Sequence, residues 1–101
     1  MVEIEWSAPA FAQLESLSQS LAFEVVRRVE VLGAFPEVGV KIENADSGLQ
    51  KYHQLIIKRS HRVVYEYDRT EGVIYTLAVQ HCRQRLPTGR DLKRRQSSDE
   101  N

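Results

Sequence analysis

Hydrophobic and polar residues follow two different periods along the first third of the chain. Over residues 2–6 they alternate, which is the pattern of a half-buried strand. Over residues 7–18 the apolar side chains recur at helical spacing behind Ser7, which predicts a helix that Ser7 caps. A second apolar stripe over residues 21–32 predicts a second helix. Because the link at residues 18–20 is so short, the two helices are expected to form an antiparallel hairpin.

The pattern of the second half predicts a sheet. Three β-rich runs, at residues 52–57, 61–67 and 73–79, are separated by polar residues that favour turns. The third run is almost continuously apolar, which is typical of a central strand covered on both faces. Residues 37–48 are rich in glycine and in residues that favour turns, and they predict a loop.

These elements, in the order β-α-α-β-β-β, predict an α+β fold with a helical hairpin packed on an antiparallel-rich, twisted sheet. A chain of 101 residues is long enough for one hydrophobic core. We therefore expect one domain over residues 1–95. Its basic end, after Gly89, allows a short helix, and residues 96–101 are expected to be a polar, disordered tail.

The composition indicates a cytoplasmic protein. Cys82 is the only cysteine, so the chain cannot form an internal disulfide, which suits a reducing compartment. The first residues lack the basic and apolar regions of a signal peptide. No apolar run approaches the roughly 20 residues that a membrane-spanning helix needs, so no membrane partner is expected.

The formal net charge of zero hides an uneven distribution. Residues 1–50 carry three basic and eight acidic side chains, a net charge of −5, whereas residues 51–95 carry eleven basic and four acidic ones, a net charge of +7. A cationic half on a neutral protein favours a phosphate-rich partner. The alternative is a solvated sheet edge that charged residues protect from aggregation.

Three stretches resemble the RelE/ParE superfamily, the toxins of bacterial type II toxin–antitoxin systems. The first is IEWSAPAFAQLESL, in which a strand ending in Trp-Ser leads into a helix with leucines near its end. The second is RVVYEYD, which is similar to a family strand in which Tyr-Arg is followed by valines and a tyrosine. In this chain His61 replaces the aromatic residue before Arg62. The third is LAVQHCR, which is similar to the family's last strand and its basic end.

The resemblance implies an antitoxin partner and two possible activities. RelE-like members cut mRNA on the ribosome and inhibit translation, while ParE-like members, known for plasmid stabilisation, poison DNA gyrase. ParE-type toxins usually have a longer first helix than the one predicted here, which favours a ribosome-dependent endoribonuclease, an mRNA interferase. A non-catalytic, antitoxin-binding and autoregulatory module is the third possibility.

Cutting RNA through its 2′-hydroxyl requires a general base, a general acid and cations near the phosphate. The resemblance assigns phosphate binding to Arg62 and Arg83, and proton transfer to His81 or His53, because imidazole titrates near neutral pH. On a continuing strand, His81 and Arg83 would face the same side. The residues expected to contact RNA or the ribosome are Lys51, Tyr52, Lys58, Arg59, Arg85 and Arg90.

The resemblance implies no metal and no cofactor, and it is imperfect at two positions. RelE has a second lysine where this chain has Leu55, and a tyrosine near the C-terminus where this chain has Gly89. A histidine would then take over the role of the tyrosine. As a structural alternative, Arg62 would only form an ion pair with Glu66 on the same face of its strand.

Overall fold

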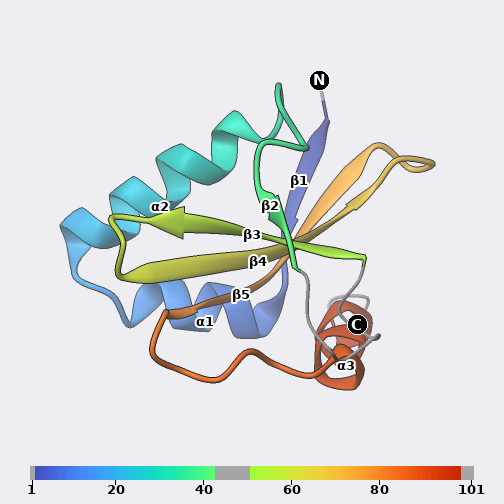
Figure 1. Ribbon diagram of the computed structural model, residues 1–101. Coiled ribbons are helices and arrows are strands. Elements are labelled where there is room, and N and C mark those ends of the chain that lie inside the picture. Colours follow the sequence, from blue (N-terminus) through green and yellow to red (C-terminus); the bar gives the residue numbers. More distant parts are fainter. Residues whose placement is uncertain (1, 43–50, 99–101) are drawn as a thin grey trace.

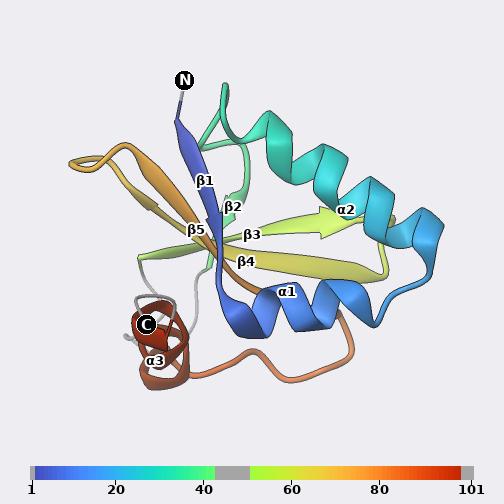
Figure 2. The ribbon, with the colours of Figure 1, turned by 180° about the vertical axis from the view of Figure 1, so that it is seen from behind.

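The computed structural model describes residues 2–42 and 51–98 and confirms the predicted α+β fold. In the described residues five strands form one mixed sheet in the order β1-β5-β4-β3-β2, and helices lie on both of its faces (Figures 1 and 2). β1 runs parallel to β5, and the other neighbouring strands are antiparallel. The elements are β1 (Glu3–Trp6), α1 (Ala8–Glu15), α2 (Gln19–Val31), β2 (Val40–Lys41), β3 (Tyr52–Ile57), β4 (His61–Asp68), β5 (Val73–His81) and α3 (Gly89–Ser98).

Serine side chains begin the first two helices. The Ser7 Oγ accepts a hydrogen bond from the Ala10 N–H at 3.1 Å, and the Ser18 Oγ accepts one from the Leu21 N–H at 3.3 Å. Both serines thereby satisfy an N–H group that has no partner inside its helix. The link between the helices therefore lies at residues 16–18, slightly earlier than expected, because Ser18 belongs to the second helix as its cap.

The sheet separates two hydrophobic cores. α1 and α2 cover one face, where the buried residues are Ala10, Val25, Val29, Leu32, Leu55, Ile57, Val63, Tyr65, Ile74 and Val79. The opposite face carries a smaller core of Ile42, Tyr52, Val64, Leu77, Ala78 and Leu92. β5 contributes to both cores, which confirms that it is a central strand with both faces covered.

α3 is longer than the short helix that the sequence allowed. It buries Leu92 completely against the smaller core, and Arg95 Nη1 donates to the Leu77 carbonyl at 3.2 Å. The helix runs to Ser98, past the expected domain boundary at residue 95, and residues 99–101 lie outside the described part. No helix in the described residues is long and apolar enough to cross a membrane.

The predicted loop at residues 37–48 contains a short edge strand. β2 has only two residues, too few for a visible alternation of apolar and polar positions, and it pairs with β3. Gly39, just before it, donates its N–H to the Tyr65 hydroxyl at 3.0 Å, and that hydroxyl donates to the Pro36 carbonyl. The rest of the predicted loop, residues 43–48, lies outside the described residues.

Candidate functional site

Two turns meet at one end of the sheet and gather most of the predicted site residues. The turn that joins β3 to β4 and the turn that follows β5 are held together by a hydrogen bond of 2.8 Å from the Cys82 N–H to the Ser60 carbonyl. We call this part of the molecule the cationic end. It comprises Lys58, Arg59, Arg62, Arg83 and Arg85, together with His61 and His81.

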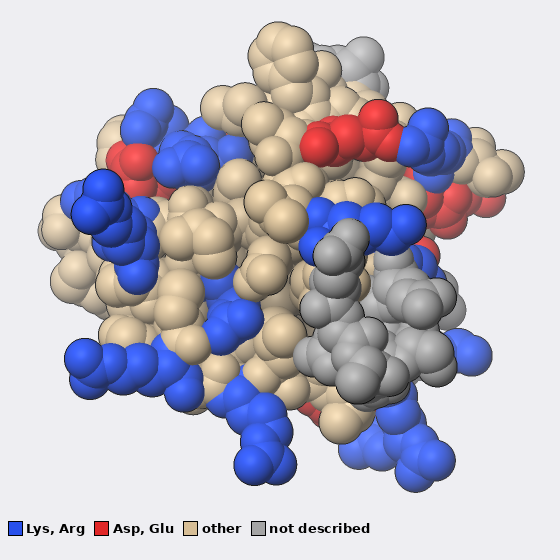
Figure 3. Space-filling model, viewed as in Figure 1, with Lys and Arg blue, Asp and Glu red and all other residues tan. Residues whose placement is uncertain are grey.

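Acidic side chains are absent from the segments that form the cationic end. The sequence has no Asp or Glu over residues 51–65 or over residues 73–90. Lys and Arg side chains spread over the left and lower parts of the face in Figure 3, where the β3–β4 turn and the segment after β5 lie. Cations gathered with few carboxylates nearby produce a positive potential that attracts phosphate.

Two histidines face each other across the strands β4 and β5. His61 and His81 are partners in the register of the sheet, and their ring centroids are 4.9 Å apart in an edge-on arrangement. They lie on the face that α1 and α2 cover, because Val63 and Val79, two residues further along each strand, belong to that core. The sequence analysis assigned proton transfer to His81 or His53, and the cross-strand register instead places His61 beside His81.

Hydrogen bonds fix the orientation of both imidazole rings. His81 Nδ1 accepts from the Arg83 N–H at 3.0 Å, so neutral His81 carries its proton on Nε2. His61 Nδ1 lies 2.8 Å from the Ser60 Oγ. Partial burial, and secondarily the neighbouring His81, lower the pKa of His61, so its neutral form is favoured near pH 7.

Arg62 braces the turn after β5. Its Nη2 donates to the Cys82 carbonyl at 2.6 Å and to the Gln84 carbonyl at 3.3 Å, and its Nη1 donates to Gln54 Oε1 at 3.2 Å. The structural alternative, an ion pair of Arg62 with Glu66, is not formed, and the Glu66 carboxylate lies 3.8 Å from Lys51 Nζ. Most donors of Arg62 are therefore committed to the protein itself, which makes it a positioning residue.

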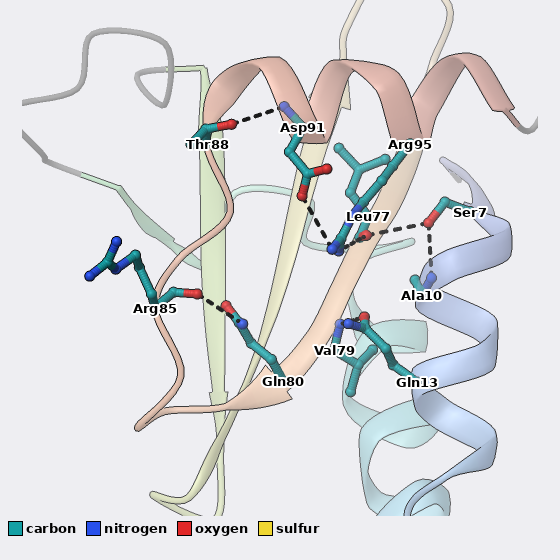
Figure 4. A network of polar contacts seen from close by, with 10 residues as sticks. All are labelled: Ser7, Ala10, Gln13, Leu77, Val79, Gln80, Arg85, Thr88, Asp91 and Arg95. Atoms are coloured by element: carbon teal, nitrogen blue, oxygen red, sulfur yellow. Dashed lines mark hydrogen bonds and ion pairs between the residues drawn. The ribbon is translucent and has the colours of Figure 1, made fainter.

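Arg83 does not share a strand face with His81, contrary to the prediction. β5 ends at His81, and the chain then turns back, since the His81 N–H donates to Gln84 Oε1 and the Gln84 N–H donates to the His81 carbonyl. Gln80, nearly buried, donates from Nε2 to the Arg85 carbonyl at 3.2 Å (Figure 4). These bonds leave the side chains of Arg83 and Arg85 exposed on a fixed turn.

The structure places His53 away from the cationic end. His53 lies four residues before the end of β3, roughly 13 Å along the strand at 3.3 Å per residue. Its ring stacks on Tyr65 with centroids 5.4 Å apart, and burial, followed by the charge of Lys41, lowers its pKa. This position makes His53 a packing residue beside β2.

Three residues expected to contact RNA also lie outside the cationic end. Tyr52 is completely buried in the smaller core, so its ring cannot stack on a base, which corrects the prediction for this residue. Lys51 lies beside it and is paired with Glu66. Arg90 is exposed on the first turn of α3, which Figure 1 shows at the opposite side from the β3–β4 turn.

The described residues contain no group of three or more His, Cys, Asp or Glu side chains that could hold a metal ion. His61 and His81 have only Cys82 nearby in sequence, and Cys82 follows His81 directly in the chain. The groups that this site offers for chemistry in the described residues include two imidazoles and several fixed cations.

Comparison with known proteins places this architecture in a toxin family. The model of the ParE toxin of the type II toxin–antitoxin system parDE matches residues 4–86. No curated protein sequence matches the chain. The protein belongs to the ParE toxin family, and it is a toxin of a type II toxin–antitoxin system in the RelE/ParE superfamily.

Solved structures of the superfamily have the same fold at low sequence identity. The toxin–antitoxin complex RelBE2 from Mycobacterium tuberculosis matches with a TM-score of 0.70 and 20% identity, over 79% of this chain and 96% of that chain. The intact RelBE complex from E. coli matches with a TM-score of 0.69 and 12% identity, over 83% and 100%. The YoeB/ParE toxin from Agrobacterium tumefaciens matches with a TM-score of 0.64 and 13% identity, over 78% and 96%.

Proposed function

We propose that the protein arrests translation by cutting mRNA on the ribosome, without a metal ion. The observation that carries this proposal is the meeting of His61 and His81, 4.9 Å apart, with four exposed cations and no acidic residue in the same segments. A surface that only bound an acidic protein would not need two oriented imidazoles, whereas cutting RNA through its 2′-hydroxyl needs a base and an acid.

The two histidines divide the proton transfers between them. His81 acts as the general acid in its protonated, imidazolium form, and donates a proton to the leaving 5′-oxygen. His61, whose pKa is lowered, is neutral near pH 7 and can accept the proton of the attacking 2′-hydroxyl. Arg83 stabilises the charge that develops on the phosphate, and Arg62 holds the turn that carries Arg83.

The remaining exposed cations bind the partner molecules. Lys58, Arg59 and Arg85 contact the phosphates of mRNA or ribosomal RNA. Because its target is the translating ribosome, the toxin acts in the cytoplasm. The M. tuberculosis and E. coli relatives are complexes with their antitoxins. We propose that a cognate antitoxin likewise neutralises this toxin, and that acidic residues of the antitoxin cover the cationic end.

A gyrase-directed toxin is the second candidate, because the family model that matches the chain is that of ParE. In that case the cationic end would be a contact surface for DNA gyrase, and the two histidines would have no chemical role. The short first helix, of eight residues, argues for the ribosome-dependent activity, since ParE-type toxins usually have a longer one.

Inducible expression in bacteria, with mapping of mRNA 5′ ends soon after induction, separates the candidates. We expect new cuts inside translated reading frames that disappear when translation is blocked. Growth arrest with intact mRNA and an SOS response would support gyrase as the target instead. Absence of growth arrest would support a non-catalytic module that binds only the antitoxin.

Arg83→Ala tests the site with the least structural disturbance. The Arg83 side chain is exposed and forms no hydrogen bond or ion pair in the described residues, so the melting temperature is expected to stay the same. Loss of one cation that stabilises the transition state is expected to slow mRNA cutting about 100-fold or more. A fully toxic, folded Arg83→Ala protein would show that Arg83 has no role in catalysis.

A further inference from the structure

The β3–β4 turn has a backbone conformation that its side chains do not favour. The turn is closed by a hydrogen bond of 3.1 Å from the Ser60 N–H to the Ile57 carbonyl. Its two central residues, Lys58 and Arg59, both have positive φ angles, 50° and 63°. These are the only non-glycine residues with positive φ in the described part of the chain.

Two consecutive positive φ angles are the signature of a type I′ turn, in which Asn-Gly is the most favourable pair. Lysine and arginine have a Cβ atom that crowds the backbone in this left-handed region, whereas glycine has none. The chain therefore has two long cationic side chains at positions where stability alone favours short or absent ones. Strain of this kind, once observed, suggests a function for the residues that carry it.

The turn adds to a cationic surface of α2. α2 contacts β3, and Val25 of α2 belongs to the same core as Ile57, the last residue before the turn, so the helix lies beside the strand that leads into the turn. Glu24 of α2 accepts two hydrogen bonds from Arg27. The pKa of Glu24 is lowered by that bond and further by the charges of Lys58 and Arg28, which places both cations within electrostatic reach of its carboxylate.

We propose that Lys58, Arg59, Arg27 and Arg28 form a binding surface for the phosphate backbone of RNA, independent of base sequence. This surface extends from the cationic end onto α2, which no motif in the sequence had indicated. It has four cations and one carboxylate, a net charge of +3, and the carboxylate is already paired with Arg27.

The inference rests on the proposed function for the identity of RNA as the ligand. The same surface could attract an acidic segment of an antitoxin, and the experiment distinguishes the two. Binding to phosphates releases counterions, so RNA affinity must fall steeply as salt concentration rises.

The test replaces the strained pair with the residues that the turn favours, in the variant Lys58→Asn/Arg59→Gly. We expect the melting temperature to rise by about 5 °C, because the strain is relieved. Affinity for a labelled single-stranded RNA is expected to fall about tenfold, and the slope of log affinity against log salt to decrease by about 1.4, at about 0.7 per lost phosphate contact. A structural role for the pair would change the melting temperature alone.

Two further variants complete the test. Arg27→Gln/Arg28→Gln removes two charges from α2 without touching the turn, and it is expected to lower RNA affinity without raising the melting temperature. Arg69→Gln/Arg94→Gln removes the same number of charges from the β4–β5 loop and α3, and it should bind RNA as the unmodified protein does. All measurements use the full chain.

Unchanged RNA affinity in Lys58→Asn/Arg59→Gly would overturn the inference, and so would an equal loss in the Arg69→Gln/Arg94→Gln control. Weaker binding to the antitoxin with unchanged RNA affinity would assign the surface to the antitoxin and also overturn it. If the RNA affinities change as expected while mRNA stays intact after induction, the proposed endonuclease activity fails and the RNA-binding surface stands. If mRNA is cut but RNA affinity does not depend on these residues, the proposed endonuclease activity stands and the RNA-binding surface fails.

Discussion

The role of Arg62 can be tested by its effect on stability. The resemblance assigns phosphate binding to Arg62, whereas the structure shows that Arg62 donates hydrogen bonds to the turn at residues 82–84. Replacing Arg62 with alanine removes three hydrogen bonds, of which the bond to the Cys82 carbonyl, at 2.6 Å, is the shortest. The turn that carries Arg83 then loses its side-chain hydrogen bonds to β4.

The size of the effect follows from the number and burial of these bonds. A hydrogen bond with a charged partner contributes about 1.5–3 kcal/mol when it is buried. The carbonyls that Arg62 binds lie close to the surface, so water can replace part of the interaction, and we expect a total loss of about 2–3 kcal/mol. For a domain of this size, that loss lowers the melting temperature by roughly 10–15 °C.

Thermal melting followed by circular dichroism measures the change, with Arg83→Ala as the matched control. Arg83 is an exposed arginine on the same turn, and its replacement should leave the melting temperature unchanged. Arg62→Lys is expected to recover less than half of the loss, because one ammonium group cannot bind two carbonyls and an amide in the geometry of a guanidinium. If Arg62→Ala melts within 2–3 °C of the unmodified protein (about 0.5 kcal/mol), the bracing role is refuted.

Three other predictions concern the fold around the site. A Cβ atom at Gly39 would lie 2.5 Å from the Tyr65 hydroxyl, so Gly39→Ala should destabilise the protein by about 1–3 kcal/mol in urea unfolding. His53 and His61 have pKa values below their ordinary value of 6.5, so as the pH falls these two histidines are protonated in the unfolded chain before they are protonated in the folded one. Stability should thus fall as the pH drops below about 6.5, and His53→Gln/His61→Gln should flatten this dependence in melting curves. Leu92→Ala should cost about 2–5 kcal/mol, because Leu92 is completely buried under α3, and a loss below 1 kcal/mol would mean that α3 is not anchored there.

The sequence determined the elements whose signal is local. Alternation predicted the strand at residues 2–6, helical spacing predicted α1 and α2, and the apolar run at residues 73–79 predicted the central strand. Each of these patterns repeats over several residues, so single exceptions do not hide it. β2 was missed because two residues are too few for any period, and α3 was underestimated because its apolar face depends mainly on Leu92.

The sequence also supplied the residue types of the candidate site but not their arrangement. It indicated the cationic half, His81 and the arginines. It also grouped His53 and Tyr52 with them, but His53 lies near the other end of β3 and Tyr52 is buried in the smaller core. It assumed that β5 continues to Arg83. The strand ends at His81, and the N–H groups of Arg83 and Gln84 donate back to the ring and the carbonyl of His81.

Only the tertiary structure decided which of these side chains meet. The pairing of His61 with His81 depends on the register between β4 and β5, and a shift of one residue would turn either ring to the opposite face of the sheet. The contacts of Arg62 with residues 82–84 likewise join positions 20 or more residues apart in the chain. Composition and period are properties of short segments, whereas register and turn geometry arise from packing between segments, and these determine the chemistry at the cationic end.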